Sequence, residues 1–175
     1  MPRAACRPLF GLINLHKPPG LTSRDCVNEI QRLVWPNKVG HAGTLDPMAD
    51  GVLAILVGDA VRLVDWLHQL SKIYVAQFEL GKRSESYDDQ TPIEVLASPS
   101  QPSLEQLMTA CQQMCGPIRQ RPPAYSAIRI DGRRAYERAR SGEHVVVPER
   151  RVDVHRLSLL EYDFPFFRFE LHCSS

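Results

Sequence analysis

The feature that most constrains the fold is an uninterrupted apolar run from Val52 to Val57, bounded by Gly51 and Gly58. A run this short and this apolar is typical of a strand that is buried on both faces. The residues before it, 39–51, are polar and rich in glycine, which permits backbone conformations that other residues avoid. The sequence therefore predicts a polar loop that leads into a buried strand.

Short strands and helices alternate with proline and glycine breakers along the rest of the chain. Alternating or apolar runs predict strands at 11–16, 73–80, 145–147, 151–160 and 164–173. Helical spacing of apolar residues predicts helices from a Thr22 or Ser23 cap to Val34, and at 59–70, 103–115 and 133–140. Asp131-Gly132 is a hairpin signal, and loop dominates 82–102. Without a regular βαβ rhythm, an α+β fold around a mixed, mainly antiparallel sheet flanked by helices is favoured.

Length and composition point to one globular domain, or to one and a fraction. The chain has 175 residues and is 43% hydrophobic, which is enough for a real core. No apolar run approaches the roughly 20 residues of a membrane span, and the N-terminus lacks the apolar region of a secretory signal, so we expect a cytoplasmic protein with no membrane contact. Five scattered cysteines, an odd number, favour reduced thiols.

Charge is unevenly distributed. The net charge is only +1, but residues 119–151 hold nine arginines against four acids. Such a segment can lie along a phosphate backbone. A solvated arginine-rich surface without a ligand is the alternative that composition leaves open.

Asp46, which is followed by Pro47, has two interpretations from its spacing alone. An aspartate before proline can cap a helix or begin a turn, or its carboxylate can do chemistry. His41 lies five residues away, off the common metal spacings, so we expect no metal there. Cys111 and Cys115 share a helix face, and core packing is favoured over metal binding.

Two further features, Tyr74 and the Lys17-Pro18 pair, leave the same choice between structure and function. Tyr74, on an alternating strand, can fill the core or stack on a nucleobase. Lys17-Pro18 is by itself a charged turn.

Four stretches together resemble one family. Residues 11–23 carry K-P-x-G-x-T-S, and 40–47 carry G-H-x-G-x-L-D-P. Residues 71–74 resemble the K-x-Y motif, and 122–127 resemble P-P-x-Y-S-A. In this order and separation, the motifs resemble the TruB family of tRNA pseudouridine-55 synthases.

The resemblance implies a pseudouridine-synthase-like fold and an isomerase that acts on tRNA. Asp46 would be the nucleophile that converts the T-loop uridine at position 55 to pseudouridine, after the base is flipped out of the RNA. Attack at C1′, attack at the uracil ring and a glycal route all remain open. Tyr74 would stack on the flipped uracil, and His41 would fill the space that the base leaves.

The remaining implied contacts involve the tRNA T-arm and T-loop. The implied substrate-binding residues also include Lys17, Pro18, Gly43 and Thr44. The implied RNA-binding residues are Arg121, Tyr125, Arg129, Arg133 and Arg134. We expect no cofactor, no metal and a monomer.

The implied domain organisation is a tail at 1–10 and a catalytic domain at 11–175, with an RNA-clasping insertion at about 119–151. Residues 171–175 resemble the start of C-S-x-G-T-Y-I-R, so we expect the C-terminal part of the domain, with its arginine, to be missing and activity to be weak or absent. Residues 84–88 depart mildly from the family's T-D-T-x-D. A non-catalytic RNA-binding or tRNA-folding module is the alternative function. A small-molecule glycosidic enzyme fits less well, because Asp46 lacks the second carboxylate that such enzymes use.

Overall fold

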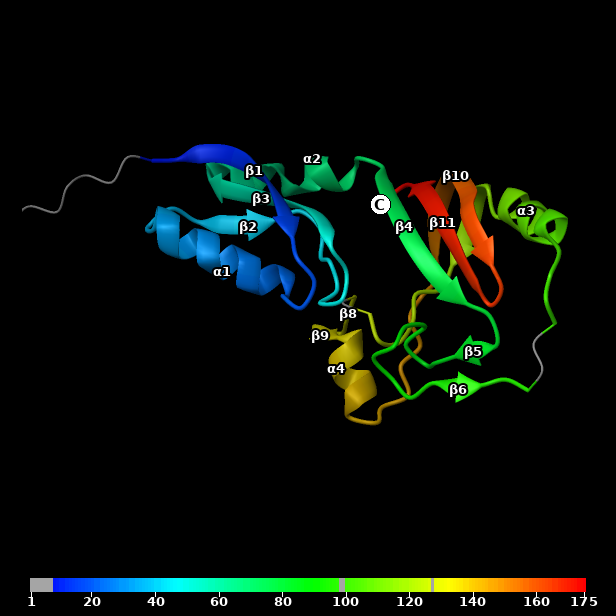
Figure 1. Ribbon diagram of the computed structural model, residues 1–175. Helices are drawn as coiled ribbons and strands as arrows, with labels where there is room; N and C mark the ends of the chain where they lie inside the picture. The colour runs from blue at the N-terminus through cyan, green and yellow to red at the C-terminus, as the bar shows by residue number, and fades with distance from the viewer. Residues whose placement is uncertain (1–7, 98–99, 127) are drawn as a thin grey trace, which may run out of the picture. The chain divides into compact units, whose positions relative to one another are not determined.

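The computed structural model describes residues 8–97, 100–126 and 128–175, and Figure 1 shows its elements. The chain forms two compact units that meet at Leu70 and Ser71 in the sequence, and each is described by itself. Helices accompany sheets whose strands all pair antiparallel, which confirms the α+β class. Of the predicted N-terminal tail, 1–7 lie outside the described residues.

The first unit contains a three-stranded sheet in the order β1-β3-β2. Its strands are β1 (Phe10–Lys17), β3 (Gly51–Gly58) and β2 (Val39–His41). The predicted apolar strand is central β3, and Leu53, Ile55 and Leu56 are at most 1% exposed. Strand β2 lies within the stretch that we predicted to be loop.

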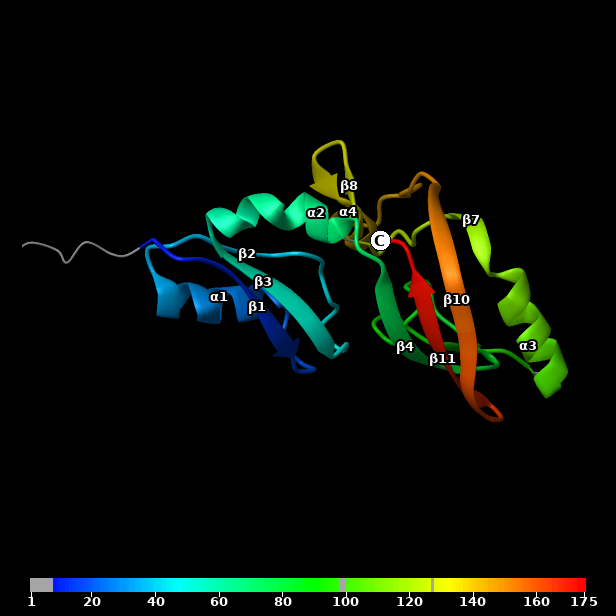
Figure 2. The same cartoon turned by 90° about the horizontal axis from the view of Figure 1, so that it is seen from above.

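Helices cover both faces of β3, as Figure 2 also shows from above. Cys26 and Val27 of α1 (Ser23–Val34) pack against alternate residues of β3, Leu53 and Ile55 among them. The opposite side meets the 3₁₀ turn η1 (Asp59–Leu63) and the short helix α2 (Val64–His68). The single helix predicted at 59–70 is therefore wrong in its first part, because Asp59–Leu63 winds more tightly.

The second unit is built on a four-stranded sheet in the order β4-β11-β10-β7. Its strands are β4 (Lys72–Glu79), β11 (Phe166–Cys173), β10 (Arg150–Asp163) and β7 (Gly116–Gln120). Helix α3 (Leu104–Gln113) packs beside β10. Val152, Val154 and Cys173 form its buried cluster, and the rings of Phe78 and Phe167 stack at 5.2 Å.

Two short ribbons complete the second unit. One pairs β5 (Lys82–Arg83) with β6 (Glu94–Val95). The other pairs β8 (Arg129–Ile130) with β9 (Arg133–Arg134) and leads into helix α4 (Ala135–Arg140). Asp131 and Gly132 both have positive φ, so the predicted Asp-Gly hairpin is confirmed.

One prediction about the second unit was wrong, and one strand was not predicted. Residues 145–147 form no strand, although Val147 is only 2% exposed, so this run of valines reflects burial without a partner strand. Gly116-Pro117 ends α3 as expected, but it also begins β7. Proline is tolerated there because β7 is an edge strand.

Within the residues that the structure describes, no helix has the length and apolar character needed to cross a lipid bilayer. The cysteines described, Cys26, Cys111, Cys115 and Cys173, are free thiols, as expected.

Gly58 ends β3 at a place where no side chain fits. Its φ is +65°, and a Cβ atom built there would lie 1.8 Å from the carbonyl oxygen of Leu9. We expect Gly58→Ala to lower the free energy of unfolding of the first unit by about 2 kcal/mol or more, because both the backbone conformation and the contact are unfavourable.

A urea titration followed by tryptophan fluorescence measures this, since Trp35 and Trp66 both belong to the first unit. Gly11→Ala, on neighbouring β1, is the matched control because nothing lies within 4 Å of its added Cβ. Equal midpoints for the two variants would contradict the account of Gly58.

Candidate functional site

Asp46 lies in the loop that leaves β2 and enters β3. The Ala49 amide donates to the Asp46 carbonyl at 3.1 Å, so residues 46–49 form a turn with Pro47 in its second position. Of the structural alternatives that the sequence left open, the turn is observed and the helix cap is not. The Asp46 side chain is exposed, and its carboxylate has no hydrogen bond or ion pair within the described part of the chain. The loop thus presents a free carboxylate on a defined turn.

Lys17, at the end of β1, is completely buried beside this turn. Its Nζ donates to the carbonyls of Pro18 at 3.0 Å, Leu21 at 2.8 Å and Pro47 at 3.3 Å. An ammonium has three donors, and all three are used. The Gly20 amide also donates to the Pro47 carbonyl, at 2.7 Å. This geometry indicates that Lys17 holds the turn in place, rather than making the substrate contact that we predicted for it. Pro18, the next residue, is exposed.

Ser23 fixes the other side of Asp46. Its hydroxyl donates to the Leu45 carbonyl at 3.1 Å and accepts from the Leu45 amide at 2.9 Å. The sequence suggested only a helix cap for Thr22 or Ser23, and the structure gives the cap to Thr22. Ser23 is thus a residue that sequence reasoning missed, because its partner is 22 residues away.

His41 and Gly43 meet at the start of the loop. The His41 Nδ1 lies 2.7 Å from the Gly43 carbonyl oxygen. Because a carbonyl only accepts, Nδ1 carries the proton in this contact, which leaves Nε2 to accept if the ring is neutral. Gly43 has a φ of +103°, a conformation that favours glycine, and the following Thr44 is exposed.

Tyr74 belongs to the second unit, on edge strand β4 and opposite Leu171 of β11. Its side chain is 46% exposed, so it does not fill the core. Partial burial raises the pKa of the Tyr74 phenol, so its hydroxyl keeps its proton at neutral pH. An exposed ring with a protonated hydroxyl can stack and donate a hydrogen bond.

The predicted RNA-binding residues of the second unit fall into two groups. Arg121 pairs with Glu149 at 2.9 Å, and Arg133 pairs with Glu143 at 3.0 Å. The Tyr125 hydroxyl donates to a Glu85 carboxylate oxygen at 3.5 Å. The guanidinium groups of Arg129 and Arg134, by contrast, have no acidic partner among the described residues, although the Arg134 backbone amide donates to Glu137 at 3.4 Å.

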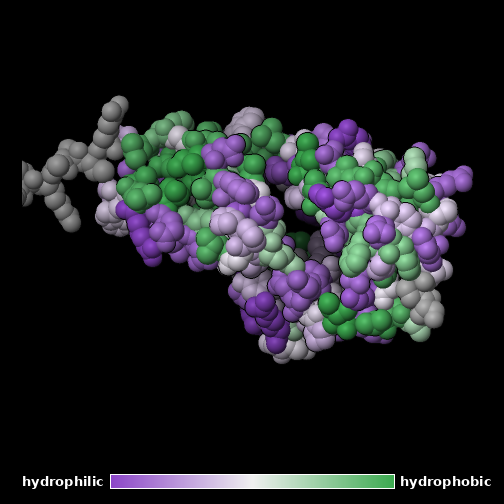
Figure 3. All heavy atoms as spheres, viewed as in Figure 1, coloured by the Kyte–Doolittle hydropathy of each residue, from purple (hydrophilic) through white to green (hydrophobic). Residues whose placement is uncertain are grey.

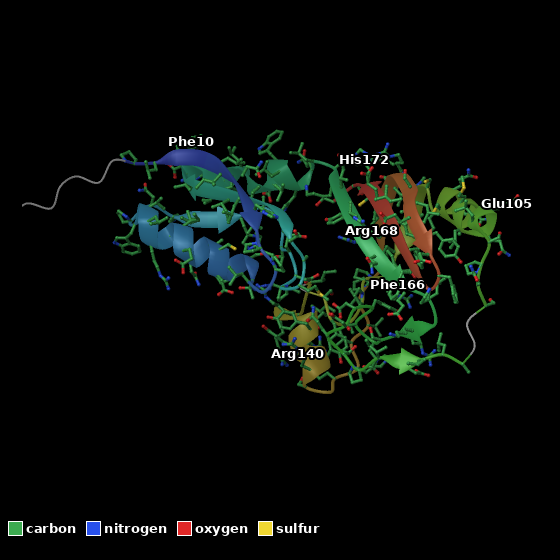
Figure 4. The ribbon with its side chains drawn as sticks, viewed as in Figure 1. Phe10, Glu105, Arg140, Phe166, Arg168 and His172 are labelled. Carbon is green, nitrogen blue, oxygen red and sulfur yellow. The ribbon has the colours of Figure 1, made fainter. Side chains whose placement is uncertain are left out.

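Tyr136 lies between two of the arginines of this segment. The guanidinium carbons of Arg134 and Arg140 lie 5.9 and 5.6 Å from the centre of its ring. Figure 4 labels Arg140 on α4, and Figure 3 shows hydrophilic side chains gathered over this helix. The sequence analysis did not single out Tyr136 or Arg140 as site residues. The i, i+4 spacing of Tyr136 and Arg140 on a helix was the available signal.

The hairpin and α4 are tied together by ion pairs. Arg138 contacts Glu143 at 2.7 Å and Asp131 at 3.5 Å. The hydrogen bond from Arg138 holds the pKa of Glu143 below its ordinary value. Arg138 therefore stabilises the protein through ion pairs with its own carboxylates.

The described residues contain no cluster of three or more side chains suited to a metal ion. Cys111 is buried in α3, whereas Cys115 lies two residues past the end of that helix and is exposed, so the predicted core packing is confirmed for Cys111 and wrong for Cys115. The Cys115 thiol donates to the Cys111 carbonyl at 3.4 Å. Burial raises the pKa of the Cys111 thiol, which disfavours the thiolate that binds metals.

Comparison with known proteins gives a consistent result. "tRNA pseudouridine synthase B" of Rhodopirellula baltica is 39% identical over 172 residues, which cover 95% of this chain and 49% of that protein. The protein of the same name from Microcystis aeruginosa is 42% identical, with 95% and 58% covered. The chain thus spans about half the length of the curated relatives it matches.

Solved structures agree. A Cbf5-Nop10-Gar1 complex contains a chain with a TM-score of 0.69 and 28% identity, covering 95% of this chain and 40% of its own. An H/ACA RNP bound to a substrate RNA containing 2′-deoxyuridine gives a TM-score of 0.64 and 26% identity, with 94% and 38% covered.

The family model described as "TruB family pseudouridylate synthase (N terminal domain)" matches residues 31–175. The match includes the Asp46 turn, Tyr74 and the arginine-rich segment. The chain therefore belongs to the TruB family of pseudouridylate synthases.

Proposed function

We propose that this chain carries the nucleophile and RNA contacts of a tRNA pseudouridine synthase that isomerises uridine 55 in the T-loop. The observation that carries the proposal is Asp46, an exposed carboxylate without a partner in the described residues, on a turn fixed at both ends. The names of the relatives support tRNA as the substrate. We further propose that the protein acts in the cytoplasm as a monomer and without a cofactor.

The reaction requires a nucleophile and a place for the displaced base. The C1′–N1 bond breaks, and its electron pair stays on the uracil. The base then turns, C5 bonds to C1′, and the proton on C5 is lost while N1 gains one. The Asp46 carboxylate suits the nucleophilic part because it is exposed and has no partner among the described residues.

The other residues of the proposed site differ in role. Tyr74 would stack on the flipped uracil and donate through its protonated hydroxyl. His41 would fill the space that the base leaves, with Nε2 available to the RNA. Pro18, Gly43 and Thr44 would line the approach of the RNA. Lys17 would hold the turn from beneath rather than contact the RNA.

The phosphates of the tRNA backbone would first bind the arginines whose guanidinium groups lack an acidic partner. Arg129 and Arg134 can meet phosphates without giving up an ion pair within the described residues. Arg121 and Arg133 would exchange exposed carboxylate partners for phosphate, at small cost because exposed pairs contribute roughly 0–1 kcal/mol. Tyr125 could release Glu85 in the same way.

Asp46→Asn should reduce tritium release from C5-labelled uridine in a tRNA transcript to background, because an amide cannot replace the carboxylate nucleophile. The measurement uses the protein as its source cell makes it. Asp50→Asn is the matched control because it removes a different carboxylate from the same loop. The Asp50 carboxylate lies 3.5 Å from His16 Nε2. Release by Asp46→Asn at the wild-type rate would rule out the role of Asp46.

The alternative function, a non-catalytic RNA-binding or tRNA-folding module, gives a different pattern. Wild-type protein would then bind tRNA without any tritium release, and Asp46→Asn would bind equally well. Turnover by the wild type excludes this alternative.

The double variant Arg129→Ala/Arg134→Ala should weaken tRNA binding. It should also reduce the slope of log affinity against log salt by about 1.5, since each lost phosphate contact removes about 0.7–0.9. Arg168→Ala is the control: this half-buried arginine of β11, labelled in Figure 4, pairs with Glu161 at 3.2 Å. Filter binding over a series of salt concentrations measures both, and an unchanged slope in the double variant would contradict the assignment.

A further inference from the structure

We propose that Ser23 is a positioning residue for Asp46, and this inference rests on the proposed function of Asp46. Ser23 does not contact the carboxylate. It holds the peptide group immediately before the nucleophile, and so sets where the Asp46 side chain begins.

The contact between Ser23 and Leu45 pairs the Ser23 hydroxyl with both backbone polar groups of Leu45. The hydroxyl accepts from the Leu45 amide at 2.9 Å and donates to the Leu45 carbonyl at 3.1 Å. A strand neighbour would satisfy a residue in the same way, through one donor and one acceptor. Ser23 is only 3% exposed, and Leu45 packs against the core cluster of the first unit, so water does not readily replace the hydroxyl.

The residue after Asp46 is fixed independently. The Pro47 carbonyl accepts from Lys17 Nζ at 3.3 Å and from the Gly20 amide at 2.7 Å. Asp46 itself accepts from the Ala49 amide through its carbonyl. The backbone is therefore held before, at and after Asp46, and what remains free is the rotation of a short side chain.

The Ser23 hydroxyl is available to bond Leu45 because Thr22 caps the helix. Thr22 accepts from the Asp25 amide at 3.1 Å, and the Asp25 carboxylate accepts from the Thr22 amide at 2.9 Å. None of the hydrogen bonds described for Thr22 reaches residues 45–47. The two neighbouring hydroxyls at the start of α1 thus have different roles. The Thr22 hydroxyl caps the helix, and the Ser23 hydroxyl holds the loop that carries Asp46.

Loss of the Ser23 hydroxyl should act on the rate of reaction. Without it, the partly buried amide and carbonyl of Leu45 lose their partner, and we expect the loop to shift to find new ones. A displacement of about 1 Å at a reacting group can cost about 100-fold in rate. We therefore expect Ser23→Ala to lower kcat by about 10- to 100-fold, with the KM for tRNA within about two-fold of wild type.

Two comparison variants separate positioning from folding. Thr22→Ala removes the cap of the same helix without touching the loop, so it should lower the urea midpoint but leave kcat within about two-fold. Ser23→Thr keeps the hydroxyl and should recover most of the rate lost in Ser23→Ala. All four proteins are assayed by tritium release, at a temperature where circular dichroism shows each to be folded.

Hydrogen exchange gives a readout that does not depend on activity. The Leu45 amide should exchange faster in Ser23→Ala than in wild type or Thr22→Ala, because only Ser23→Ala removes its acceptor. Unchanged exchange at Leu45, or equal losses of kcat in Ser23→Ala and Thr22→Ala, would overturn the inference.

The two proposals fail in distinguishable ways. If Asp46→Asn is inactive and Ser23→Ala keeps full kcat, the proposed function stands and the positioning role of Ser23 is wrong. If wild-type protein binds tRNA without tritium release, the proposed function is wrong and the positioning role falls with it, whatever the exchange at Leu45 shows.

Discussion

The burial of β3 on both faces determines the layout of the first unit. The helix α1 covers one side, and η1 with α2 meets the other. Strands β1 and β2 then pair along its two edges, with Lys17 opposite Gly51 and His41 opposite Ile55. The end of β1 therefore lies where β3 begins, which places the Lys17 ammonium beneath the loop that carries Asp46. A polar loop acquires a fixed shape because a strongly apolar strand fixes both of its ends.

In the second unit, carboxylates already neutralise part of the arginine-rich segment. The arginine-rich segment looks uniformly basic in sequence, but several of its guanidiniums already bind carboxylates, and Arg138 binds two. The charge that can meet an incoming polyanion is therefore smaller than the count of arginines implies. The stacking of Arg134 and Arg140 on Tyr136 orients two of them without neutralising either.

Periodicity predicted those parts of the chain whose structure depends on local burial. The apolar run became β3, the capped stripe from Ser103 became α3, and Asp131-Gly132 became a hairpin turn. The strand prediction for 145–147 was wrong because three consecutive valines do not show whether a partner strand is present. Strand β2 has three residues, too few for a period to appear.

The sequence also predicted only part of the candidate site. The motif resemblance identified Asp46, His41 and Tyr74 as site residues, but it could not show what each side chain contacts. The buried state of Lys17 and the link between Ser23 and Leu45 depend on partners 22 to 30 residues away, a separation at which sequence patterns carry no geometric information. These contacts became visible only once the strands were in register.

The hydrogen bonds described above for the Asp46 turn, which involve Lys17, Gly20, Ser23 and Ala49, lie inside the first unit. These hydrogen bonds join segments that the ribosome has finished before Ser71 is added. Under the proposed function, sequence drift in the arginine-rich segment of the second unit can then change which RNA is recognised while these hydrogen bonds are kept.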